Sequence, residues 1–221
     1  EWAADSKKVL EKINANLSYP IFVKPANGGS TIGIQKVSQA NKTSQAIQDT
    51  LKFDTRILVE QGITDCIEIN VSVLGKPGNA ETSVPEQPIS HDEFLSYADK
   101  YERGGGKKSG MASATRRIPA PISSDTTKKL QDLAKKVFHV LGCSGVIRID
   151  FFVDPSTDTF YVIEPNTIPG SMSYYLWEAS GLSYPKLIDR LVEIAEARSK
   201  THESLIQSYE SNILTINAEN N

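Results

Sequence analysis

The stretch that decides the fold reads Val146-Ile147-Arg148-Ile149-Asp150-Phe151-Phe152-Val153 and returns as Phe160-Tyr161-Val162-Ile163-Glu164-Pro165-Asn166. Both runs are apolar and β-rich, and the turn-forming residues 154–158 separate them, which predicts a β-hairpin. Residues two apart on a strand share a face, so Arg148 and Asp150 project together. Glu164 and Asn166 do the same, and the hairpin would bring both polar pairs to one site.

These four polar groups indicate a metal site. Polar and charged side chains in apolar strands are costly to bury without partners. Two carboxylates and an amide oxygen suit Mg²⁺, which proteins usually hold with one or two carboxylates and substrate phosphates. We therefore interpret Asp150, Glu164 and Asn166 as Mg²⁺ ligands. The alternative is a hairpin that contains only an internal Arg148–Asp150 salt bridge.

Composition limits the classes of protein that the chain can represent. Its 221 residues can form one large domain or two small ones, and the net charge of −3 gives no sign of nucleic-acid binding. No apolar run is long enough for a membrane span. Cys66 and Cys143 make neither a disulfide framework nor a metal-type spacing, which favours the reducing cytoplasm.

Periodicity along the chain predicts a mixture of helices and strands. Helices are expected over 5–15, 38–51, 125–141 and 184–197, and further strands over 20–24, 31–37, 56–60 and 68–74. Strong apolar periodicity is lost over 75–121, where three successive glycines, 104–106, predict a mobile loop.

A glycine-rich segment between two predicted strands contains the groups that a phosphate loop uses. Gly28 and Gly29 let the backbone approach a ligand, and successive N–H groups in such a turn form an anion-binding concavity. Ser30 and Thr31 add hydroxyl donors, and Lys24 adds a charge. Taken alone, however, this segment favours a plain tight turn over a phosphate loop. The next strand end, 57–63, could offer backbone groups to an adenine edge.

Several short stretches together carry a family resemblance. They are 22–25, 29–33, 58–60 with Glu68, 97–101, 117–121, 145–151, 164–170 and 177–185, in this order along nearly the whole chain. In this set the chain resembles the D-alanine–D-alanine ligase family of the ATP-grasp superfamily.

The resemblance implies an ATP-grasp fold, in which two α+β subdomains enclose a nucleotide site. The smaller would be 1–66, with the phosphate loop, and the larger 67–221, with the Mg²⁺-binding hairpin and the mobile loop 75–121. The implied activity is that of a cytoplasmic, ADP-forming ligase of peptidoglycan precursor synthesis. ATP would phosphorylate the carboxylate of one D-alanine, and the amine of a second amino acid would attack the acyl phosphate. The full-length family member would be a homodimer that binds neither nucleic acid nor membrane.

The resemblance also implies a role for each site residue. The phosphates would be held by Lys24, Gly28, Gly29, Ser30 and Thr31, the adenine would face Glu60, Gln61 and Ile63, and Glu68 would bind the ribose. Two Mg²⁺ ions, or Mn²⁺, would be bound by Asp150, Glu164 and Asn166. The catalytic groups would be Lys100 at the γ-phosphate, Tyr101 in the closing loop, and Arg148 with the backbone of Gly170 at the developing negative charge.

Three departures from the family pattern qualify these implications. Residues 1–221 do not include the N-terminal domain that contributes to the first substrate site in the family. By themselves they are therefore expected to bind ATP weakly and to ligate poorly or not at all. Residues 102–114 differ from the usual lid sequence. Tyr175 stands near the position where the family uses a serine to bind the carboxylate of the second substrate. The alternatives are therefore a nucleotide-binding fragment that is inactive alone, and an ATP-grasp ligase whose second substrate is D-serine or D-lactate.

Overall fold

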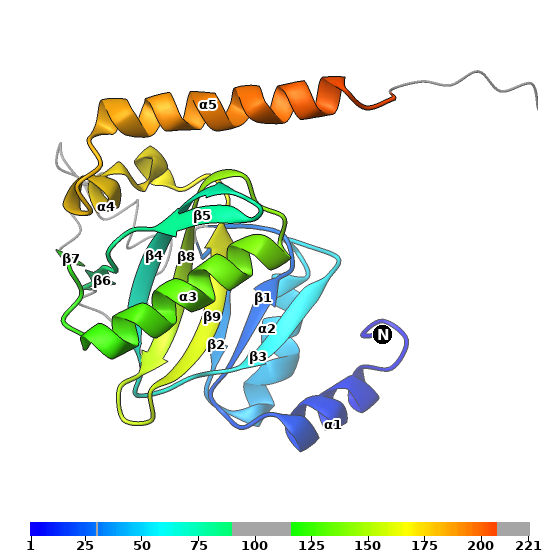
Figure 1. The fold of residues 1–221 in the computed structure, drawn as a ribbon. Coiled ribbons are helices and arrows are strands. Elements are labelled where there is room, and N and C mark those ends of the chain that lie inside the picture. Colours follow the sequence, from blue (N-terminus) through cyan, green and yellow to red (C-terminus); the bar gives the residue numbers. More distant parts are fainter. Residues whose placement is uncertain (30, 90–115, 207–221) are drawn as a thin grey trace, which may run out of the picture. The chain divides into compact units, whose positions relative to one another are not determined.

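The computed structural model describes residues 1–29, 31–89 and 116–206, which fall into two compact units (Figure 1). The first unit contains residues 1–66. The second contains residues 67–88 and the described chain from Arg116 onward. No helix in these ranges is long and apolar enough to cross a membrane.

The first unit is a small antiparallel sheet with helices packed against it. Helix α1 (Ser6–Asn16) begins at Asp5, whose side chain accepts the Lys8 N–H at 3.0 Å. The sheet has the order β2-β1-β3, with β1 (Ile21–Pro25) between β2 (Gln35–Val37) and β3 (Ile57–Gln61). The short 3₁₀ helix η1 (Ala40–Lys42) leads into α2 (Thr43–Thr50). The buried core consists of Ile13, Ile21, Val23, Val37, Ala46 and Ile47.

Two predictions in this unit need correction. The strand expected over 31–37 begins only at Gln35, because Thr31 and Gly33 have φ angles of 66° and 76°, outside the extended region. Residues 31–33 form a turn instead. The single helix expected over 38–51 is divided into η1 and α2.

The second unit is built on an antiparallel sheet with the order β5-β4-β8-β9. Its strands are β4 (Ile67–Lys76), β5 (Asn79–Thr82), β8 (Gly145–Asp154) and β9 (Thr159–Asn166), so the predicted hairpin is confirmed. Helix α3 (Ser124–Val140), which begins at the N-cap Ser123, covers one face (Figure 1). Alternate strand residues meet this helix, and the buried core includes Ile69, Val71, Val73, Ile147, Ile149, Phe151, Leu130, Ala134 and Phe138.

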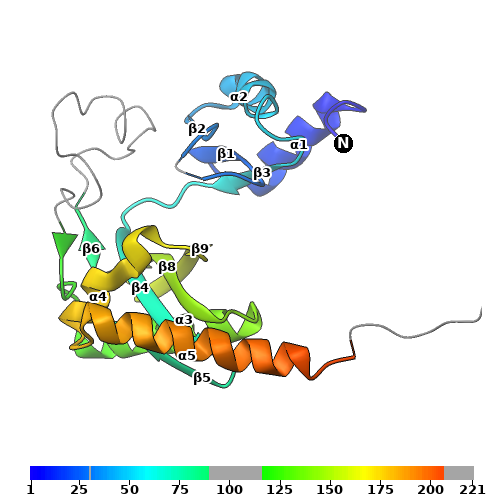
Figure 2. The same ribbon diagram turned by 90° about the horizontal axis from the view of Figure 1, so that it is seen from above.

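The opposite face of this sheet is apolar at one end and polar beyond it. Leu74 and Val146 pack against Trp177 of α4 (Tyr174–Ala179) and Leu187 of α5 (Tyr184–Glu203). Figure 2 shows α5 leading away from α4 along this unit. Trp177 Nε1 donates to Ser72 Oγ at 2.9 Å, and Ser72 Oγ donates to the Ile147 carbonyl at 2.9 Å. The polar part of the face begins at this buried hydroxyl.

A bulge in the hairpin separates its two halves. Asp150 lies opposite Glu164, but Phe151 lies opposite Val162, which leaves Ile163 as the extra residue. A bulge of this kind shifts the alternation of side chains by one. In a regular strand, Phe160 and Glu164 would lie on the same face because they are four residues apart. The bulge lets Phe160 pack with the α3 core while Glu164 stays on the polar face.

Both ends of the range predicted as a mobile loop contain strands. β5 follows β4 directly, and β6 (Gln87–Pro88) pairs with β7 (Arg116–Arg117). Ser83 and Glu86, between β5 and β6, are buried. These strands are short and carry few apolar residues, so periodicity did not predict them. The glycines 104–106 lie outside the described residues, and mobility there stays a prediction.

We expect Ser72→Ala to lower the free energy of unfolding by about 1–3 kcal/mol, because it leaves the buried Trp177 N–H without an acceptor. Urea denaturation measures the change. Ser199→Ala is the control, since Ser199 is exposed on α5, and surface changes usually stay within about 0.5 kcal/mol. Equal effects of the two substitutions would show that the Trp177–Ser72 bond contributes little.

Candidate functional site

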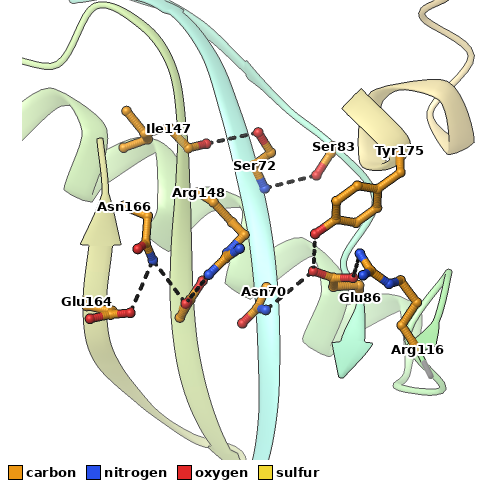
Figure 3. A network of polar contacts seen from close by, with 11 residues as sticks. Asn70, Ser72, Ser83, Glu86, Arg116, Ile147, Arg148, Glu164, Asn166 and Tyr175 are labelled. Carbon is orange, nitrogen blue, oxygen red and sulfur yellow. Dashed lines mark hydrogen bonds and ion pairs between the residues drawn. The ribbon is translucent and has the colours of Figure 1, made fainter. Parts of the chain in front are cut away.

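A polar cluster lies on the face of β8 and β9 that points away from α3. Arg148 Nε and Nη2 donate to the two oxygens of Asp150 at 2.6 and 2.7 Å. Asn166 Nδ2 donates to Asp150 Oδ2 at 3.0 Å and lies 3.4 Å from Glu164 Oε1 (Figure 3). The register places Arg148 opposite Asn166 and Asp150 opposite Glu164. The predicted convergence of the two polar pairs is therefore confirmed.

The cluster carries more negative than positive charge. The Asp150 side chain is 8% exposed, and burial raises its pKa. The bond from Arg148 works against this effect, while the nearby charges of Glu164 and Glu86 add to it. Burial is the largest single effect on Arg148 and opposes its charge. The hydrogen bond to Asp150 and the nearby negative charges together outweigh burial, so the pKa of Arg148 is raised. Such a group of carboxylates around one guanidinium favours an added cation.

The oxygens of this cluster fit Mg²⁺ when a bound phosphate completes its coordination. In the described part of the chain, no three His, Cys, Asp or Glu side chains are grouped so that they could hold a metal ion. A metal here would thus depend on Asp150, Glu164 and the amide oxygen of Asn166, together with ligands from a substrate. The Asn166 nitrogen faces both carboxylates, and a half-turn of the amide presents its oxygen at the same place. The Arg148–Asp150 salt bridge is also present, so the salt bridge and the metal site are compatible interpretations.

In the first unit, two predicted nucleotide residues form an ion pair. Lys24 Nζ on β1 lies 2.6 Å from Glu60 Oε2 on β3. The register pairs Phe22 with Glu60, so Lys24 and Glu60 are diagonal neighbours on one face. The adjacent Gln61 side chain accepts the Ser18 N–H at 3.0 Å. Lys24, which is predicted to bind phosphate, and Glu60, which is predicted to face the adenine, thus lie side by side on this sheet.

The glycine-rich loop is open to a ligand. Asn27 anchors its start, because its backbone N–H and its side-chain Nδ2 both donate to Asp54 Oδ2, at 2.8 and 2.9 Å. Gly28 and Gly29 are exposed, and a Cβ added at Gly29 would meet nothing within 4 Å. Thr31 continues the loop with its positive φ, while Ser30 lies outside the described residues.

The other predicted site residues are placed as follows. Ile63 is half-buried after β3, Glu68 is exposed near the start of β4 opposite Phe152, and Gly170 begins the short turn η4 (Gly170–Ser173). Lys100 and Tyr101 lie outside the described residues. The second unit therefore brings together the predicted metal ligands and Arg148.

A second polar cluster adjoins the first, and the sequence did not predict it. Tyr175 Oη donates to Glu86 Oε1 at 2.7 Å, and Arg116 Nη1 lies 3.4 Å from Glu86 Oε2. The Arg116 guanidinium also lies 4.1 Å from the centre of the Tyr175 ring. Asn70 Nδ2 is 3.4 Å from Glu86 Oε1, and Asn70 is the direct cross-strand neighbour of Asp150. Figure 3 shows Asn70 between the two clusters.

The turn that leads to Tyr175 has an uncommon backbone. Ser171, Met172 and Ser173 have φ angles of 52°, 54° and 50°, a left-handed conformation that residues other than glycine seldom adopt. Ser173 is fully buried, and its hydroxyl has no hydrogen-bond partner in the structure. Strained backbone of this kind persists where the surrounding structure imposes it, often at functional sites. No sequence signal pointed to this turn, since none of its three residues is a glycine.

The Tyr175 phenol keeps its hydrogen at neutral pH. Burial, the charge of Glu86 and the hydrogen bond to Glu86 together raise the pKa of Tyr175 to about 12. The carboxylate of Glu86 and the phenol of Tyr175 therefore form a stable acceptor–donor pair.

The fold and the polar face of its larger sheet define a class of known proteins. The structure superposes on the D-alanine–D-alanine ligase from Coxiella burnetii with a TM-score of 0.74 at 30% identity, over 92% of this chain and 52% of that one. The VanG D-Ala:D-Ser ligase from Enterococcus faecalis gives a TM-score of 0.71 at 29% identity, over 86% and 53%. The predicted α+β, ATP-grasp fold is confirmed.

The sequence comparisons then give the family. Residues 1–193 match the family model described as the D-ala D-ala ligase C-terminus, and the chain belongs to this family. It is 40% identical over 204 residues to the D-alanine–D-alanine ligase of Natranaerobius thermophilus, which covers 90% of this chain and 53% of that protein. For the Clostridium acetobutylicum enzyme the identity is 36% over 203 residues, with 90% and 56% covered. The chain thus spans about half the length of the curated relatives that it matches.

We expect Tyr175 to make the protein less stable at high pH. The folded state holds the Tyr175 pKa at about 12, whereas an exposed tyrosine ionises near pH 10, so the unfolded chain loses this proton first. The stability that the buried phenol contributes is full below about pH 10 and is lost as the pH rises toward about 12. The measurement is the free energy of unfolding against pH, compared with Tyr175→Phe, which has no ionisable group at this position. Parallel curves for the two proteins would contradict the raised pKa.

Proposed function

We propose that the natural protein is an ATP-dependent, ADP-forming carboxylate–amine ligase of the D-alanine–D-alanine type. The observation that carries the proposal is the convergence of Arg148, Asp150, Glu164 and Asn166 on one sheet face, inside the region that matches the family model. The relatives that bear this name extend well beyond the matched region, so the complete substrate site is part of the proposal.

The proposed reaction has two steps. The γ-phosphoryl group of ATP passes to the carboxylate of a D-alanine, and the amine of a second amino acid then attacks the acyl phosphate and displaces phosphate. Catalysis of phosphoryl transfer depends mainly on positioning and on neutralising charge. Asp150 holds Nε and Nη2 of Arg148, which fixes the guanidinium and leaves its Nη1 hydrogens for a phosphoryl oxygen. The backbone of Gly170 and, from the segment outside the described residues, Lys100 and Tyr101 would complete the catalytic groups.

Each of the nucleotide-binding residues has a proposed role. Lys24 and the loop around Gly28, Gly29, Ser30 and Thr31 would hold the phosphates, Glu60, Gln61 and Ile63 would face the adenine, and Glu68 would bind the ribose. Mg²⁺, or Mn²⁺ in its place, would be held by Asp150, Glu164 and Asn166 and would offset the charge of the transferred phosphate. The exposed glycines of the loop and the short Lys24–Glu60 distance of 2.6 Å support this arrangement.

The proposal includes the setting of the enzyme. Its substrates would be small D-amino acids, its product a peptidoglycan precursor, and its location the cytoplasm, where it would act as a homodimer. The names of the relatives support the substrate class. The likeness to a D-Ala:D-Ser ligase keeps D-serine as a second candidate for the amine substrate.

The central test is whether ADP release by the natural protein depends on D-alanine. We expect ATP turnover with D-alanine and Mg²⁺ present, formation of D-alanyl-D-alanine, and neither without D-alanine. Mass spectrometry of the product together with a coupled ADP assay measures both. ATP hydrolysis at the same rate with and without D-alanine would contradict the ligase proposal. Residues 1–221 alone should bind ATP but form little or no product. Without the N-terminal part of the first substrate site, the carboxylate of the first D-alanine would not be positioned and would lose most of the benefit of proximity.

We expect Glu164→Gln to weaken binding of Mg·ATP by roughly tenfold or more, since it removes one charged metal ligand without changing size. Binding of ATP without Mg²⁺ should change little, because the effect depends on the metal. Calorimetric titration with and without Mg²⁺ measures both affinities. Glu193→Gln, on the exposed surface of α5, makes the same substitution away from the site and serves as the control. The metal assignment is wrong if Glu164→Gln affects both affinities equally or neither of them.

A further inference from the structure

The glycine-rich loop of the first unit is held at its start by one carboxylate. Asp54, in the turn between α2 and β3, accepts both the backbone N–H and the side-chain Nδ2 of Asn27 on a single oxygen, Oδ2, at 2.8 and 2.9 Å. Its other oxygen, Oδ1, accepts the Arg56 N–H at 3.0 Å, so the carboxylate is itself fixed to the chain that enters β3. The hydrogen bonds from Arg56 and Asn27 lower the pKa of Asp54, which is therefore charged at neutral pH.

The end of the loop is held by residues that come shortly before Asp54 in the chain. Thr50, the last residue of α2, is fully buried, and its Oγ1 donates to the Gly33 carbonyl at 3.0 Å. The Phe53 ring lies against Gly33, since a Cβ added to this glycine would come within 2.8 Å of the ring atom Cδ2. The same added atom would lie 3.0 Å from Pro25 Cγ. The beginning and the end of the loop are therefore close together beside this ring.

Thr50, Phe53 and Asp54 together form what we call the loop brace. A glycine-rich loop has many conformations, and a ligand that must select one of them loses affinity through the entropy of ordering. A brace that fixes both ends of the loop beforehand reduces this cost. The charge of Asp54 by itself would repel a phosphate, because like charges that face each other are unfavourable. Its two bonds to Asn27 give the carboxylate a different role, which is to hold the loop.

We propose that Asp54 is a positioning residue for ATP, which holds the glycine-rich loop in the conformation that receives the phosphates of the nucleotide. This inference rests on the proposed binding of phosphate by the loop and adds a residue that does not touch the nucleotide. Because Asp54 occupies the backbone N–H of Asn27, the N–H groups that face the phosphates begin at Gly28. Positioning and charge predict opposite results: loss of the carboxylate weakens ATP binding if Asp54 holds the loop, and strengthens it if its charge alone matters.

A comparison of ATP with adenosine tests the proposal, because adenosine has no phosphates. Calorimetric titration of the natural protein with Mg·ATP gives one affinity, and displacement of bound ATP by adenosine gives the other. We expect Asp54→Asn and Asp54→Ala each to weaken ATP binding by roughly tenfold, the effect of losing about one charge-assisted hydrogen bond, and to leave adenosine binding unchanged. Asp49→Asn is the matched control, because this carboxylate of α2 bonds Lys52 and Gln45 instead of the loop, and it should change neither affinity.

The two affinities separate positioning of the loop from support of the fold. Equal weakening of ATP and adenosine in the Asp54 variants, or tighter ATP binding in Asp54→Asn, would overturn the proposal. A natural protein that binds ATP no better than adenosine would overturn it together with the proposed phosphate site, whereas the D-alanine dependence of ADP release tests the ligase function separately.

Asn27→Ala provides a second variant on the other side of the contact. It removes the side-chain bond to Asp54 and keeps the backbone bond, so we expect a smaller loss of ATP affinity. Combined with Asp54→Ala it should cause no further loss, because the two substitutions remove the same bond. If the Asp54 variants do not fold, Asn27→Ala decides the question, since Asn27 is exposed, and an unchanged ATP affinity in this variant would overturn the proposal.

Discussion

The structure depends on a strand that must satisfy two opposite environments. β8 is the inner strand between β4 and β9, and its alternate residues meet either the α3 core or the polar face. On the polar face, the half-buried Arg148 and the buried Asp150 would be costly if either stood alone. Their two short hydrogen bonds make the pair acceptable, and the pair then fixes which residues of the neighbouring strands can lie beside it. Asn166 and Asn70, which lie opposite this pair, both carry amides.

The two polar clusters behave as one electrostatic system. Asp150 and Glu86 are buried carboxylates, and Arg148 and Arg116 are their guanidinium partners. Because the interior screens charges weakly, each group influences the others beyond its own hydrogen bonds. The raised pKa of Asp150 and the raised pKa of Tyr175 both include the effect of Glu86. A phosphate or a cation that enters this region meets charged groups whose positions are already fixed by hydrogen bonds.

The sequence predicted those parts of the fold that local patterns determine. The hairpin, the pairing of Arg148 with Asp150, and the helix expected over 125–141 follow from strand alternation and helical periodicity. The roles of the site residues stay proposals. The bulge at Ile163 could not be predicted from the local sequence. It allows Phe160 to pack in the core under α3, whose residues are distant from Ile163 along the chain.

Other features were missed for a similar reason. The burial of Glu86 results from contacts with residues far along the chain, Arg116 and Tyr175 among them. The left-handed turn at Ser171–Ser173 contains no glycine from which it could be predicted. Its conformation is imposed by the surrounding structure. These are the places where the local preference of the chain is overruled by its neighbours.

The bulge at Ile163 also bears on how such a sequence can diverge. It separates the hairpin into a distal half, around the turn at Asp154, and a proximal half that carries Glu164 and Asn166. Because the irregularity already absorbs one residue of slippage, the tip of the hairpin can gain, lose or exchange residues without moving the proximal carboxylate and amide to the wrong face. Selection can therefore act on the tip and on the polar cluster separately. The hairpin thus combines an exposed tip with a fixed register at the polar cluster.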